Sequence, residues 1–107
     1  MLEKMNQINA LYDVYQTLLT KKQQAYLESY YQEDLSLAEI ASDLGVSRNA
    51  VHDNIRRTEK ALIGYEEKLK IYEKDRKRQS IYDKIKASTE DKIILAYLKQ
   101  LEAVEEN

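Results

Sequence analysis

The sequence of 107 residues predicts an all-α fold, and three of its features support that prediction. Proline is absent and glycine occurs twice, so the residues that the tight turns of β-hairpins need are missing. Apolar residues recur at steps of three and four, which is the spacing of one helix face. Thr20 and Ser36 are each followed three positions later by Gln or Glu, the capping-box pattern of a helix start.

The first two helices are predicted from their apolar spacing and from one cap. The first helix is expected over residues 3–19, and the second begins after the capping box of Thr20 and Gln23. A turn at residues 33–35 ends the second helix. Tyrosines on these helices are expected to bury their rings and keep their hydroxyls at the edge of the core. The side chains expected on the buried faces are Ile8, Leu11, Tyr12, Tyr15, Leu18, Leu19, Ala25, Leu27, Tyr30 and Tyr31.

The third and fourth helices have clear start and stop signals. The capping box of Ser36 and Glu39 starts the third helix, Gly45 ends it, and Ser47 is placed to cap the fourth. Gly64 falls inside the fourth helix, so it marks either a close packing contact or a weak point before the tail. The apolar stripe of this long helix is expected to run through Val51, Ile55, Thr58, Leu62, Tyr65, Leu69 and Tyr72.

The remaining chain predicts a helical tail. A basic run at residues 76–78 is expected to be a solvated linker, with a contact to phosphate or RNA as the alternative. Residues 88–91 predict the start of a last helix. We therefore expect a domain at residues 1–66 and a tail at residues 67–107 that packs on it or pairs with another copy. The tail's apolar residues are Ile81, Tyr82, Ile85, Ile94, Tyr97, Leu98, Leu101 and Val104.

The run LAEIASDLGVSRNAVHDNIRR at residues 37–57 has what two steeply packed helices require. Ala41 is small where the second helix approaches, Gly45 supplies a left-handed turn, and Val46 is expected to fill the core beneath that turn. This pattern predicts a helix-turn-helix spanning residues 36–60. The apolar wedge between its helices is expected to consist of Ile40, Leu44, Val51 and Ile55.

The outer side of the second of these helices is where a helix-turn-helix presents side chains to the major groove of DNA. Arg48 is suited to guanine, Asn49 to adenine and Asp53 to cytosine, while the later cations are suited to phosphates. Glu59 is also expected outside, and a solvated face with local charge pairs is the alternative. The predicted nucleic-acid-binding residues are Ser47, Arg48, Asn49, His52, Asp53, Arg56, Arg57 and Lys60.

The composition argues against several other functions. Cysteine is absent and His52 is the one histidine, so no disulfide, thiol chemistry, metal or cofactor site is expected. His52 and Asp53 are adjacent and are expected to point in different directions, and we find no catalytic set of residues, so an enzyme is not expected. No membrane span or signal peptide is recognised, which favours a cytoplasmic protein.

Charge is unevenly distributed along the chain. Residues 1–46 hold three Lys/Arg and seven Asp/Glu, residues 47–79 hold ten and six, and residues 80–107 hold four and six. Positive charge is therefore concentrated around the fourth helix, although the net charge of the chain is −2. This distribution permits a local contact with an anionic partner.

Residues 18–62 resemble the promoter-reading fourth region of bacterial sigma factors, although Asn54 stands where many sigma factors have a basic residue. Over nearly the full length the chain resembles the YlxM family of small bacterial helix-turn-helix proteins. The motifs that carry this resemblance include LYDVY at residues 11–15, SRNAVHDNI at residues 47–55 and YEEKL at residues 65–69. The resemblance implies a regulatory role and a link to the signal recognition particle pathway.

Two functions follow as hypotheses. The first is a regulator that binds DNA, or less readily RNA, as a homodimer joined through its tail. The second is an adaptor that has no specific DNA site and binds a protein of the signal recognition particle pathway through its acidic N-terminal half and tail.

Overall fold

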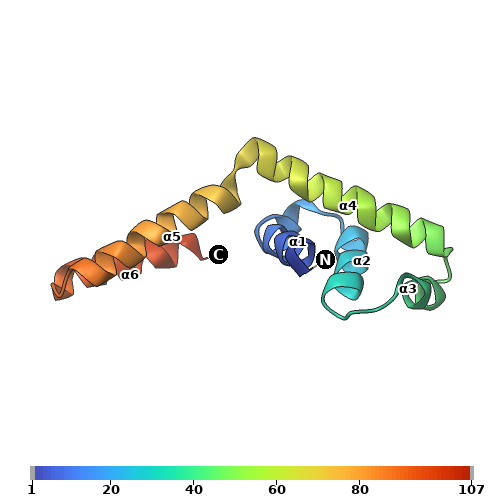
Figure 1. The fold of residues 1–107 in the computed structure, drawn as a ribbon, viewed down its shortest axis with the longest axis horizontal. Helices are drawn as coiled ribbons and strands as arrows, with labels where there is room; N and C mark the ends of the chain where they lie inside the picture. The colour runs from blue at the N-terminus through green and yellow to red at the C-terminus, as the bar shows by residue number, and fades with distance from the viewer. Residues whose placement is uncertain (1, 107) are drawn as a thin grey trace. The chain divides into compact units, whose positions relative to one another are not determined.

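The computed structural model describes residues 2–106 (Figure 1). The predicted all-α fold is confirmed, because this part of the chain contains six α-helices, one 3₁₀ helix and no strand. The chain divides into two compact units, unit 1 (Met1–Leu69) and unit 2 (Lys70–Asn107). The elements are α1 (Leu2–Tyr15), η1 (Gln16–Leu18), α2 (Lys21–Tyr31), α3 (Leu37–Leu44), α4 (Arg48–Leu69), α5 (Ile71–Ser88) and α6 (Lys92–Glu105).

Unit 1 is built around α4, which contacts α1, α2 and α3. Figure 1 shows these three helices along one side of α4. Val51, Thr58 and Leu62 of α4 are completely buried against them. Burial of each large apolar side chain contributes about 1.5–3 kcal/mol, so this stripe fixes the side of α4 that faces the core. Residues of α1, α2 and α3, together with Leu19 directly after η1, pack against this stripe to form the core. They are Ile8, Leu11, Tyr12, Tyr15, Leu19, Tyr26, Leu27, Tyr31, Ile40 and Ala41.

The first helix is shorter than predicted. It ends at Tyr15, and the chain continues as the 3₁₀ turn η1 before Leu19 becomes extended. The tighter 3₁₀ turn changes the angle between successive side chains, so the α-helical spacing does not continue. Leu19 is buried but Leu18 is 51% exposed, and the predicted burial of Leu18 is wrong. In α2 the predicted burial of Ala25 is also wrong, because Tyr26 takes that place in the core.

Both predicted capping boxes are confirmed. The N–H of Gln23 donates to Thr20 Oγ1 at 3.1 Å, and the N–H of Thr20 donates to Gln23 Oε1 at 2.9 Å. The box of Ser36 and Glu39 has both hydrogen bonds at 3.1 Å. Each box satisfies helix-start N–H groups that would otherwise lack partners, so α2 and α3 begin where the sequence predicts.

Buried tyrosines join the helices through their hydroxyls. The predicted arrangement, a buried ring with a hydroxyl at the edge, is confirmed for Tyr12, Tyr15 and Tyr31. Burial and the adjacent carboxylate raise the pKa of Tyr12 to about 12. In each case the tyrosine hydroxyl donates to a glutamate carboxylate on another helix. The pairs are Tyr12 to Glu28 (2.8 Å, α1 to α2), Tyr15 to Glu66 (2.6 Å, α1 to α4), Tyr31 to Glu59 (α2 to α4) and Tyr82 to Glu105 (3.1 Å, α5 to α6).

The fourth helix does not continue into the tail. Lys70 has the left-handed φ of 54° between α4 and α5, so Leu69 is 46% exposed and Tyr72 belongs to the next helix. The predicted stripe is therefore wrong beyond Tyr65. Gly64 lies within a continuous α4, and a Cβ built there meets no atom within 4 Å. Gly64 thus marks neither a close contact nor the break, and the roles predicted for residues 1–66 and 67–107 stay predictions.

Unit 2 is a hairpin of α5 and α6. The basic run at residues 76–78 lies inside α5, so its prediction as a linker is wrong. Asp91 caps α6, since its carboxylate accepts from the N–H groups of Ile93 at 2.8 Å and Ile94 at 3.3 Å. The two helices are joined by ion pairs of 2.7 Å (Arg78 to Glu105) and 2.8 Å (Lys86 to Glu102).

Candidate nucleic-acid interface

The turn between α3 and α4 is built as a helix-turn-helix requires. Gly45 adopts the predicted left-handed conformation at φ 68°, and the N–H of Val46 donates to the carbonyl of Ala41 at 3.1 Å. The predicted cap at Ser47 is confirmed, because its hydroxyl accepts from the N–H of Ala50 at 3.0 Å. In Figure 1, α4 runs across the view and α3 points close to the line of sight, so the two helices cross steeply.

The apolar wedge between α3 and α4 differs in part from the prediction. Ile40, Val51 and Ile55 are buried as expected. Leu44 is 52% exposed and Val46 is 38% exposed, so neither fills the core beneath the turn. Leu44 is the last residue of α3 and Val46 lies in the turn, directly after the left-handed Gly45. Together with α2 they line an open hollow of about 260 Å³.

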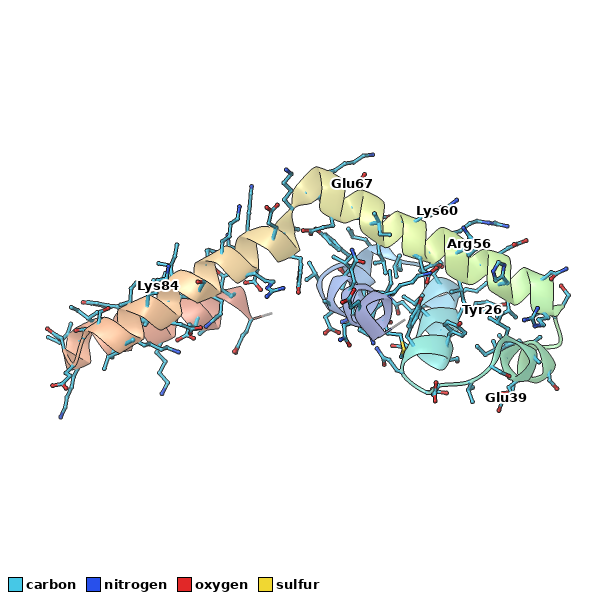
Figure 2. All side chains as sticks on the ribbon, viewed as in Figure 1. Tyr26, Glu39, Arg56, Lys60, Glu67 and Lys84 are labelled. Carbon is cyan, nitrogen blue, oxygen red and sulfur yellow. The ribbon has the colours of Figure 1, made fainter. Side chains whose placement is uncertain are left out.

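The predicted binding residues all lie on the exposed surface around α4. Because successive residues of a helix are rotated by about 100°, five of them lie opposite the buried stripe and two lie at its edge. Figure 2 shows Arg56 and Lys60 on the side of α4 that faces away from the other helices of unit 1. The first group is Asn49, Asp53, Arg56, Arg57 and Lys60, the second is Arg48 and His52, and Ser47 precedes the helix as its cap.

Glu59 is not on this surface, and its predicted exposure is wrong. Only 8% of Glu59 is exposed, and its carboxylate accepts a hydrogen bond from Tyr31 and pairs with Lys4 at 3.7 Å. The pKa of Tyr31 is raised, mainly because its ring is buried and secondly because its hydroxyl donates to Glu59. Since Glu59 is turned inward, the exposed side chains of residues 47–60 include four Lys/Arg and one carboxylate, that of Asp53. We call these exposed side chains the α4 face.

Two further residues of α4 differ from expectation. His52 Nδ1 lies 3.6 Å from Asp53 Oδ1, so these neighbours do approach each other, on the surface. Asn54 is half-buried, and its side-chain oxygen is buried without a hydrogen-bond partner in the part of the chain that the structure describes. The absence of a basic residue at position 54 therefore removes no charge from the α4 face.

Lys4 is a cation beside this face that the sequence analysis missed. With His52, Arg56 and Glu59 it lines a small cavity of about 110 Å³. Lys4 lies in the first turn of α1, and the packing of α1 against α4 brings its side chain close to the α4 face. No spacing in the sequence signals that approach.

Residues 2–106 are the part of the chain that the structure describes. That part of the chain has no group of three or more His, Asp or Glu side chains arranged to hold a metal ion. None of its helices is long and apolar enough to cross a membrane.

Fold and surface together define a helix-turn-helix protein with further helices after the motif. Residues 2–102 match the model of the UPF0122 family, described as "Putative helix-turn-helix protein, YlxM / p13 like". The chain belongs to this family, and the resemblance to YlxM proteins is confirmed.

Relatives of this family cover nearly the whole chain. A UPF0122 protein of Oceanobacillus iheyensis is 50% identical over 101 residues, which cover 94% of this chain and 96% of the relative. A Geobacillus relative is 46% identical over 110 residues, covering 98% and 100%. A Bacillus cereus relative is 49% identical over 107 residues, covering 98% and 97%.

Proposed function

We propose that unit 1 binds duplex DNA through the α4 face and acts as a regulator in the cytoplasm rather than as an enzyme. The observation that carries this proposal is the charge of that face, where four Lys/Arg accompany a single exposed carboxylate directly after a helix-turn-helix turn. DNA binding depends mainly on cations near phosphates, and a local cluster can supply them although the whole chain has a pI of about 5.5.

The residues of the α4 face divide into two roles under this proposal. Arg48, Asn49 and Asp53 lie in the first turns of α4, the part of a recognition helix that reads base edges. The cations one and two turns further along α4 contact phosphates and set the orientation of the helix. His52 adds a contact at the edge of the face, Ser47 fixes the start of the helix, and the phosphate-binding group is Arg56, Arg57 and Lys60.

The family supports a helix-turn-helix role, and the resemblance of residues 18–62 to the fourth region of sigma factors supports duplex DNA as the ligand. The resemblance to YlxM proteins supports a regulatory connection with the signal recognition particle pathway. A homodimer is part of the proposal, because two copies would present two α4 helices to two half-sites of one DNA site.

Selection of bound sequences from a library of random DNA duplexes tests the proposal. The wild-type chain should enrich one sequence, and Arg48→Ala should weaken preference at one base pair by on the order of 1–3 kcal/mol. Lys84→Ala is the matched control, because Lys84 is an exposed cation of α5 outside the α4 face (Figure 2). Absence of any enriched sequence, or an unchanged preference in Arg48→Ala, would contradict the proposed base contacts.

An adaptor function is the second candidate, and the exposed hollow beside α3 favours it. Lys22, Ala25, Tyr26, Leu44 and Val46 line this hollow, which lies outside the α4 face. An apolar surface of this kind suits a protein partner better than DNA.

Sequencing of DNA and RNA crosslinked to the protein in cells separates the two candidate functions. The adaptor would be favoured if crosslinked DNA and RNA are recovered only at background levels and the chain captures a signal recognition particle protein. Val46→Asp should then abolish that capture.

A further inference from the structure

The hairpin of unit 2 leaves much of its apolar surface uncovered. Among the described residues of this unit, Tyr82 and Leu98 are the buried side chains. Larger apolar side chains along both helices stay open to solvent, which is unusual for a contiguous patch on a monomer. The exposed ones and their exposed fractions are Ile71 (44%), Ile81 (54%), Ile85 (36%), Ile93 (66%), Ile94 (44%), Tyr97 (63%), Leu101 (49%) and Val104 (76%).

These side chains gather on one edge of the hairpin. Lys86 and Gln79 of α5 both reach Glu102 of α6, at 2.8 Å and 3.4 Å, and so mark the polar edge. With about 100° between successive residues, Ile81 and Ile85 of α5 and the apolar stripe of α6 turn toward the opposite edge. We call this edge the tail apolar face, and it consists of Ile81, Ile85, Ile94, Tyr97 and Leu101.

The hairpin needs a cover for this face. Unit 2 spans fewer than about 40 residues, a size at which a chain rarely buries enough apolar surface without help from an additional element. The ion pairs of Arg78 with Glu105 and Lys86 with Glu102 are partly exposed to solvent, and ion pairs that solvent reaches contribute little to stability. The tail apolar face is therefore the main source of stability that the hairpin leaves unused.

We propose that a second copy of this chain covers the tail apolar face, so that two hairpins form a four-helix bundle. The charges of the two helices favour a copy as the occupant. α5 carries six Lys/Arg and three Asp/Glu, while residues 89–107 carry two and five. A two-fold pair that sets α5 of one copy against α6 of the other brings these opposite charges together around the apolar centre.

This interface uses no residue of the α4 face. The inference rests on the homodimer of the proposed function and names its interface. Self-association is measured on the full chain without nucleic acid, so a failure to self-associate is distinguishable from a failure of the α4 face to bind DNA. If both hold, the bundle fixes two copies of unit 1 to a common tail.

Sedimentation equilibrium over a wide concentration range tests the proposal. The wild-type chain should have twice the mass of one chain, while Leu101→Glu should reduce the mass to that of one chain. Ala96→Glu adds the same charge on the same helix, at an exposed position that the helical repeat places away from both α5 and the tail apolar face, and it should keep the doubled mass. Ile85→Glu tests the same face from α5, and circular dichroism of all variants verifies that their helices are retained.

Two results would overturn the proposal. The first is a wild-type mass of one chain at every concentration, which would mean that no second copy covers the tail apolar face. The second is an unchanged doubled mass in folded Leu101→Glu and Ile85→Glu, which would place the contact elsewhere.

Discussion

At the scale of single residues, Glu59 determines how basic the α4 face is. Helical spacing alone puts Glu59 within reach of both the buried stripe and the exposed side, so the sequence does not decide its direction. Its carboxylate accepts a hydrogen bond from the hydroxyl of Tyr31 and pairs with the ammonium group of Lys4, and these contacts hold it away from the exposed side. Both partners lie far away in the sequence, so only the packed unit reveals that the acid leaves the surface.

The hydrogen bond from Tyr31 to Glu59 should be important for stability. Tyr31→Phe removes the donor and leaves a buried carboxylate with fewer partners, which should cost about 1–3 kcal/mol of unfolding free energy. Urea denaturation measures this loss. Tyr30→Phe is the matched control on the same helix, since Tyr30 is half-buried and should change stability by less than about 0.5 kcal/mol. Equal effects of the two substitutions would contradict the assigned role of Glu59.

Tyr12 should make unit 1 sensitive to alkaline pH. Its pKa in the folded protein is raised from 10.0 to about 12, because the ring is buried and the hydroxyl donates to Glu28. The proton is held more tightly in the folded state, so this stabilisation is complete below pH 10 and is lost as pH rises toward about 12. Urea denaturation at increasing pH should show a steeper loss in the wild type than in Tyr12→Phe. Parallel curves would contradict the prediction.

At the scale of helices, the element starts were easier to predict than the break after α4. The starts of α2, α3 and α4 follow from side chains that cap within three residues, which is local information. The break at Lys70 has no such signal, because lysine seldom adopts a positive φ and neither glycine nor proline is nearby. The apolar spacing continues across residue 70, so periodicity predicts one helix where there are two.

The two glycines should respond oppositely to alanine. Gly45→Ala should lower the unfolding free energy by about 1–2 kcal/mol, because position 45 needs a positive φ. Gly64→Ala should raise it by up to about 1 kcal/mol, because position 64 is inside α4 and has room for a Cβ. Thermal denaturation of both variants measures these two changes in stability. Destabilisation by Gly64→Ala would show that the glycine serves a contact or a bend in α4.

At the scale of the whole molecule, the exposure of the α4 face can be predicted from the sequence but its full surroundings cannot. The exposure of the eight predicted residues follows from the buried stripe of α4, whose spacing is visible in the sequence. The inward position of Glu59, the approach of Lys4 and the exposure of Val46 depend on how separate helices pack. Local patterns carry no information about those distances. The resulting face is more basic than the sequence suggests.

The dependence of DNA affinity on salt tests most directly whether cations of the α4 face bind phosphates. Fluorescence anisotropy would measure binding of the selected duplex by the wild type, Arg56→Ala, Arg57→Ala and the control Lys84→Ala. For each lost phosphate contact, the slope of log affinity against log salt should become shallower by about 0.9, and the control should match the wild type. Equal slopes in all four proteins would contradict the claim that the α4 face binds DNA.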